Sequence, residues 1–146
     1  LSGLVGSEMC IRDRAMVLLL DQLPRMIYRD TPKAFAGDLR AQALVAQGIA
    51  ADFDRRLPAM QRCFIYLVFE HCENLAVQNE SVSRFTALHD EQPADERAVF
   101  ADNLDYAERH QKVIARFGRF PHRNAILGRE STAEELAFLR EPGSRF

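Results

Sequence analysis

The chain contains no tryptophan, few cysteines and no motif that specifies a reaction. Its three cysteines are Cys10, Cys63 and Cys72, and no pair of them has the Cys-x-x-Cys spacing of a zinc or redox site. Cys63 and Cys72 have the pattern of buried thiols, which is typical of a reducing compartment. We therefore expect a cytoplasmic protein without a metal site.

Long apolar runs are also missing. The apolar stretch at residues 17–20 is far shorter than the roughly 18 residues that a membrane span needs. Charge is balanced, with 19 basic and 21 acidic residues and a net charge of -2, so the composition does not indicate a polyanionic partner. With 47% hydrophobic and 27% charged residues, the chain has the composition of one globular domain. We expect neither membrane nor nucleic-acid binding.

The beginning of the chain requires separate treatment. Residues 4–14 resemble the translated sequence of a sequencing-library adapter, and such segments are set aside before the fold is considered. The alternative is a genuine short N-terminus without structure. We expect residues 1–14 to be an artefact and residues 15–146 to form a single helical domain that lacks its native N-terminal helices.

Apolar residues recur at helical rather than strand spacing through the rest of the chain. We predict five to six helices and no sheet, an all-α fold. The first helix begins near Ala15 and is kinked or ended by Pro24, which cannot donate to the carbonyl of Leu20. Short connections favour stacked antiparallel helical hairpins. The other predicted helices cover about residues 31–49, 58–69, 75–88 and 94–117, with a short one after Thr132.

Local signals support these boundaries. Thr31 is expected to cap the second helix, and Gly118 suits the left-handed residue that ends the long fifth helix. Thr132 is followed by glutamates at capping-box distance. The third helix is apolar all round over residues 63–69, which predicts a central position. The face of the second helix that we expect to be inward consists of Phe35, Leu39, Ala43, Ala46 and Ile49.

Titratable residues follow the apolar part of the third predicted helix, at Glu70, His71 and Glu73. Such groups at the edge of a core can acquire shifted pKa values and act as acids, bases or metal ligands. The spacing is not that of His-Glu-x-x-His, and pairing with arginines and helix ends is the alternative. His110 faces inward on the fifth helix, where a lone histidine is a hydrogen-bonded core residue unless His71 or His122 lies near it.

Positive charge concentrates near the end of the chain. Residues 109–129 include six arginines and lysines and no acidic residue. Arg119, His122, Arg123 and Asn124 belong to a loop in this region, and guanidinium groups bind carboxylates and phosphates bidentately. The loop is therefore predicted to hold an anion, with internal pairing to carboxylates as the alternative. Binding of RNA is disfavoured because the flanking segment is acidic.

A second cluster surrounds Pro24. The bent helix is expected to bring Asp21 close to Arg25, Tyr28 and Arg29, and Asp21 can pair with Arg25 one turn later. A surface ion pair is sufficient to explain this arrangement. Arg25 and Tyr28 are nevertheless placed in the predicted ligand site.

Five segments form an ordered set of motifs. They are residues 21–25 with Tyr28 and Arg29, 31–35, 70–73, 116–124, and 127–132 with Glu135. Together they are similar to the bacterial domain-of-unknown-function family 924, from residue 15 to the C-terminus. The resemblance implies an all-helical fold related to tetratricopeptide-like hairpins, a stand-alone cytoplasmic protein and no established activity. The chain departs from the family at Leu23, Met26 and Cys72, and it lacks upstream helices rich in tryptophan.

Two functional hypotheses follow. In the preferred one, a helical binding module holds an anionic small molecule or a peptide carboxylate through Arg25, Tyr28, Arg119, His122, Arg123 and Asn124. In the other, a metal-dependent or acid-base hydrolytic enzyme uses Glu70, His71, Glu73 and His122. The sequence specifies neither a cofactor nor an oligomeric state.

Overall fold

The computed structural model describes residues 12–145, and within that range all regular structure is helical. This confirms the predicted all-α class, whereas the tetratricopeptide-like arrangement stays a prediction. The adapter-like segment lies mostly outside the described residues. A helix that includes residues 12–17 continues through a π-helical turn, η1 (Leu18–Gln22), into α2 (Leu23–Ile27). Next come η2 (Pro32–Phe35), α3 (Asp38–Ala50), η3 (Asp54–Arg56), α4 (Ala59–Glu70), α5 (Leu75–Asp90), α6 (Arg97–Phe117), η4 (Pro121–Arg123) and α7 (Ala133–Phe138).

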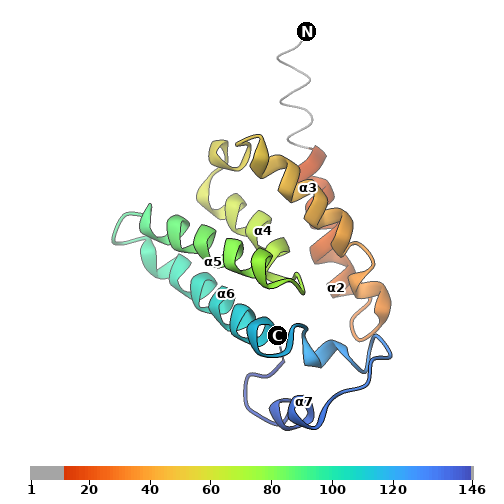
Figure 1. The fold of residues 1–146 in the computed structure, drawn as a ribbon. Coiled ribbons are helices and arrows are strands. Elements are labelled where there is room, and N and C mark those ends of the chain that lie inside the picture. The colour runs from red at the N-terminus through yellow and green to blue at the C-terminus, as the bar shows by residue number, and fades with distance from the viewer. Residues whose placement is uncertain (1–11, 146) are drawn as a thin grey trace.

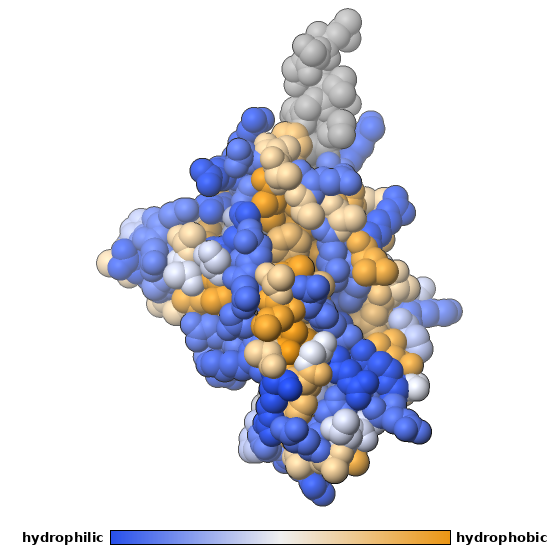
Figure 2. Space-filling model, viewed as in Figure 1, coloured by the Kyte–Doolittle hydropathy of each residue, from blue (hydrophilic) through white to orange (hydrophobic). Residues whose placement is uncertain are grey.

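α4 is the central element, as its apolar sequence predicts. It lies between α3 and the antiparallel hairpin of α5 and α6, and it contacts all three (Figure 1). Tyr66 on α4 meets the ring of Phe85 on α5 edge-on, with centroids 5.8 Å apart. Figure 2 shows apolar residues gathered down the middle of the same view, between α3 and the α5–α6 hairpin. Phe64, on the open side of α4, is 42% exposed, so this helix is not buried all round.

Pro24 does not end the first helix. Because a proline nitrogen cannot donate to the carbonyl four residues earlier, the chain forms a π-helical turn before it, with the Leu23 N–H bonded to the Leu18 carbonyl. The helix then continues to Ile27. Gly37 packs against the backbone at Leu20, where a Cβ atom would lie 2.3 Å from the Leu20 carbonyl oxygen.

The second predicted helix is two elements. The Thr31 hydroxyl donates to the Tyr28 carbonyl instead of capping η2, and the chain breaks at Gly37 before α3 begins. The break changes the rotational phase of the helix, so the predicted inward face is wrong at Leu39, which is 82% exposed. Ala43 and Ala46 are also exposed, and the buried residues of α3 are Asp38, Ala41 and Val45.

The predicted signals at later helix ends are confirmed. Gly118 ends α6 with φ of 69° in the left-handed region. Thr132 and Glu135 form a complete capping box at the start of α7. Asn74, which was not singled out, caps α5 by accepting from the N–H groups of Ala76 and Val77.

Candidate functional site

A cleft of about 590 Å³ opens where the C-terminal end of α4 meets the middle of α6 and two loops. The two loops, before α3 and before α7, lie side by side in Figure 1. Glu70 and His71 reach the cleft from α4 because they are consecutive at its end, and Tyr106 and His110 reach it from adjacent turns of α6. Its other lining residues are Arg25, Arg29, Asp30, Ala34, Phe35, His122, Arg123 and Ile126.

Behind one wall of the cleft, two buried aspartates hold three of the lining side chains. Asp21 accepts from Nδ1 of His71 at 2.8 Å and lies 3.0 Å from Arg25. Arg25 also makes a bidentate pair with Asp38, with both distances 2.9 Å, and Asp38 lies 3.7 Å from Arg123. Asp21 and Asp38 do not line the cleft themselves. Of this network, only Arg25, His71 and Arg123 line the cleft.

Protonation states in this network follow from the geometry. Burial acts to raise the pKa of Asp21, but its hydrogen bond with His71 and the charge of Arg25 hold it below the ordinary value. Ionised Asp21 only accepts, so His71 donates through Nδ1 and its Nε2 carries the lone pair when the ring is neutral. Burial lowers the pKa of His71 despite the neighbouring carboxylate. This is the arrangement that orients a histidine for proton transfer.

Arg123 is a buried cation of the cleft whose charge is poorly compensated. Its side chain is 7% exposed, and its guanidinium carbon lies over two aromatic rings, 4.5 Å from the centroid of Phe120 and 4.7 Å from that of Phe35. Its Nε has no hydrogen-bond partner in the described part of the chain. Burial, together with the charge of Arg25, lowers the pKa of Arg123 to about 10.

Burial keeps His110, His122 and Glu70 neutral near pH 7. Burial lowers the pKa of His110 to about 3 and that of His122 to about 4. His110 donates from Nδ1 to the Tyr106 carbonyl at 2.8 Å, because a carbonyl oxygen can only accept. Burial, with the nearby charge of Asp21, raises the pKa of Glu70 to about 8.

Five of the predicted site residues meet in this cleft: Arg25, Glu70, His71, His122 and Arg123. The structure places Tyr28, Glu73, Arg119 and Asn124 outside its lining. Tyr28 is 44% exposed, and the ammonium group of Lys33 lies over its ring, 5.6 Å from the centroid. Asn124 is fully buried and donates to Ser131 at 2.9 Å.

Glu73 and Arg119 hold the loops that carry the cleft residues. Glu73 binds Arg129 through both oxygens, at 2.7 and 2.9 Å, and accepts from the backbone N–H of Phe120 at 2.7 Å. Arg119 binds Glu135 through two nitrogens, at 2.6 and 2.8 Å. Both predicted site residues are therefore committed to ion pairs within the protein.

Sequence reasoning did not assign several lining residues to the site, including Tyr106, Phe35 and Ile126. His110 was treated as a core histidine unless another histidine approached it, and its ring centroid lies 6.3 Å from that of His71. The spacing of Tyr106 and His110, four residues apart on one predicted helix, was the available signal for that wall.

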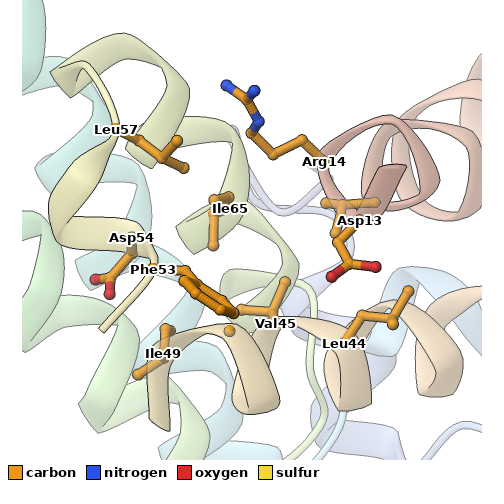
Figure 3. A pocket seen from close by; sticks show the side chains of 11 residues that line it. Asp13, Arg14, Leu44, Val45, Ile49, Phe53, Asp54, Leu57 and Ile65 are labelled. Carbon is orange, nitrogen blue, oxygen red and sulfur yellow. The ribbon is translucent and has the colours of Figure 1, made fainter. Parts of the chain in front are cut away.

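A second cavity, of about 40 Å³, lies under the N-terminal helix (Figure 3). Leu44, Val45 and Ile49 from α3 surround it with Ile65 from α4 and the ring of Phe53. Its lining also includes the charged residues Asp13, Arg14 and Asp54. At about 40 Å³ it is far smaller than the cleft.

Two further observations concern metal ligands and the lengths of the helices. Among residues 12–145, no group of three histidine, cysteine, aspartate or glutamate side chains is placed to hold a metal ion. Within the same range, no helix has both the length and the apolar character needed to cross a bilayer.

The fold and the cleft define a small all-α protein with a buried arginine and three histidines around one polar site. The chain belongs to the family described as bacterial protein of unknown function (DUF924), whose model matches residues 10–143. It is similar to a solved structure, the protein of unknown function ATU0120 from Agrobacterium tumefaciens, with 35% sequence identity and a TM-score of 0.74. The match covers 88% of this chain and 66% of the Agrobacterium chain, and a search of curated proteins gives no match.

Proposed function

We propose that the cleft is a binding site for a small anion, the carboxylate or phosphate group of a metabolite or peptide. Arg123 is the anchor of this site, with Arg25, Arg29 and the histidines around it. The protein then acts as a helical binding module. We further place it in the cytoplasm, because its free thiols Cys63 and Cys72 suit a reducing compartment.

The state of Arg123 carries the proposal. A guanidinium is always charged at neutral pH and has five N–H donors, and burying it costs free energy unless an anion compensates it. The 3.7 Å contact with Asp38 is too long for a hydrogen bond, and Asp38 already binds Arg25 through both oxygens. An oxyanion in the cleft would supply the missing acceptors.

The two rings beside Arg123 add to this argument. Phe35 and Phe120 both contact the guanidinium and hold it in place, so little conformational entropy is lost when a ligand binds. Phe35 and Ile126 also line the cleft, which suits a ligand with an apolar part beside its anionic group.

A thermal-shift screen tests this function. Wild type is heated with sulfate, phosphate, succinate and other small carboxylates, and an anion at one hundred times its Kd is expected to raise Tm by a few degrees, equivalent to ~2.7 kcal/mol. Arg123→Met keeps an unbranched side chain between the rings and should lose the response. Arg55→Met removes the same charge at a 78% exposed side chain and should keep it. Equal responses in both variants would refute Arg123 as the anchor.

The pair of Asp21 and His71 supports a second candidate, acid-base hydrolysis in the same cleft. A carboxylate 2.8 Å from Nδ1 orients an imidazole as a general base for water. Glu70 and His122 would act beside His71, whereas Glu73 is committed to Arg129. The test is turnover of p-nitrophenyl acetate and p-nitrophenyl phosphate by wild type and His71→Gln. Equal rates in both proteins would exclude His71 as the base.

A further inference from the structure

Glu70 is a buried carboxyl group that pairs with no arginine or lysine among residues 12–145. The residue is 3% exposed and lines the cleft. Its Oε1 lies 3.3 Å from Nδ1 of His110, whose proton is directed to the Tyr106 carbonyl. Its Oε2 has no hydrogen-bond partner among the described residues, and none of the ion pairs found there joins Glu70 to an arginine or lysine. An ionised carboxylate in this position would be uncompensated.

The surrounding elements make the ionised form still less favourable. Asp21, on the N-terminal helix, takes up the hydrogen bond of His71 and the charge of Arg25 that would otherwise offset a charge on Glu70. An isolated buried charge is so costly that a carboxyl group takes up a proton instead. The titratable and charged groups facing this region are Asp21, Arg25, Arg29, Asp30, Cys63, His71, Tyr106, His110, His122 and Arg123.

We propose that Glu70 binds the anion as a neutral carboxylic acid, donating its O–H to an oxygen of the ligand while Arg123 supplies the charge. This inference rests on the proposed function of the cleft and assigns the ligand class more narrowly. The partner of a carboxylic O–H at this site must be an acceptor, so the ligand group is an oxyanion with an unprotonated oxygen directed at Glu70. Binding is then linked to the proton on Glu70.

The linkage has a definite direction. When Glu70 ionises, the cleft loses a donor and gains a negative charge that repels the ligand. The competent form is the protonated one, so the apparent Kd rises as that form is depleted. With the pKa of Glu70 near 8 in the free protein, affinity is constant near neutral pH and falls in mild alkali.

Calorimetric titration with sulfate tests the inference, with succinate as a second probe, because both are dianions from about pH 6.5 to 9. For wild type, we expect the Kd to be about tenfold larger at pH 9 than at pH 7. Glu70→Gln keeps a neutral donor in the same position. Its Kd should therefore change by less than about twofold over the same range.

Proton counting supplies a second measurement that needs no variant. Titrations at about pH 8.5 in buffers of different ionisation enthalpy should show uptake of more than half a proton per sulfate bound by wild type. Glu70→Gln should take up less. Binding that requires Arg123 but is equally pH-dependent in wild type and Glu70→Gln, or involves no proton uptake, overturns the role of Glu70 alone. Absence of sulfate and succinate binding at every pH overturns the proposed function as well.

Discussion

Gly37 shows how one residue positions a wall of the cleft. The turn around Gly37 brings Phe35 and Asp38 to Arg123, and it does so by packing directly on the backbone of the N-terminal helix at Leu20. A Cβ atom would lie 2.3 Å from the Leu20 carbonyl oxygen, closer than any real contact. The side chain is therefore excluded by backbone, which cannot move aside as a flexible side chain can.

Gly37→Ala is expected to destabilise the protein by about 2 kcal/mol or more, since the clash must separate two backbone segments. Chemical denaturation followed by circular dichroism measures the change. Gly48→Ala, inside α3, is the matched control, because the added Cβ atom would have no neighbour within 4 Å. It should be neutral or stabilise by up to about 1 kcal/mol. Equal effects of the two substitutions would contradict the close approach at Leu20.

At the scale of elements, α5 depends on its first residue. Asn74 has extended backbone angles and accepts from two free N–H groups of the first turn, at 2.9 and 3.2 Å. The helix then packs against both α4 and α6. The cap at Asn74 therefore stabilises a helix that belongs to the core of the fold.

Asn74→Ala should lower the free energy of unfolding by about 1 kcal/mol, because the two donors lose their acceptor. Asn74→Asp keeps an acceptor and places a negative charge at the positive end of the helix, so its stability should match wild type or exceed it. Urea unfolding of the three proteins makes the comparison. A stable alanine variant would mean that water replaces the cap without loss.

The sequence predicted the number and order of the main helices because apolar spacing and terminal residues are local signals. Gly118 and Thr132 acted as their residue types suggest. The break at Gly37 was missed because it depends on a contact with Leu20, seventeen positions earlier in the chain. The face of α3 was consequently assigned with the wrong phase, as the exposure of Leu39 shows.

The candidate site was only half predictable for a related reason. The sequence shows which residues have side chains that can bind an anion or a proton, and five of the predicted site residues line the cleft. Which arginine remains uncompensated depends on where each carboxylate lies in the fold. Glu135 binds Arg119 and Glu73 binds Arg129, whereas Arg123 is left with the distant Asp38.

For the molecule as a whole, the buried titratable groups predict a stability optimum near pH 6.5. The pKa values of His110 and His122, about 3 and 4, are lowered by folding, so below pH 6.5 the unfolded chain binds more protons and acid destabilises. The pKa of Glu70 is raised to about 8, so between about pH 4.5 and 8 the folded protein holds a proton that the unfolded chain has lost. Each group contributes up to about 1.4 kcal/mol per pH unit.

Below pH 6.5 the effect of His110 and His122 outweighs that of Glu70, and the lowered pKa of His71 acts in the same direction as theirs. Between pH 6.5 and 8 the loss of the Glu70 proton lowers the stability. Stability should therefore fall on both sides of the optimum. Glu70→Gln should abolish the decline from about pH 6.5 to 8 and leave the acid decline in place. Urea unfolding at intervals of half a pH unit measures both limbs. An unchanged alkaline limb in this variant would show that Glu70 is ionised in the folded protein.

The central claim is that Arg123 meets an anion in the cleft, and its side-chain NMR signal reports this directly. The Nε–H resonance of Arg123 is assigned by its loss in Arg123→Lys and followed while sulfate is added at about pH 6.5, where Glu70 is protonated. The account predicts a saturable shift of this resonance, because Nε gains the acceptor that it lacks in the described structure. A resonance that stays in place while surface arginines such as Arg55 respond equally would contradict it.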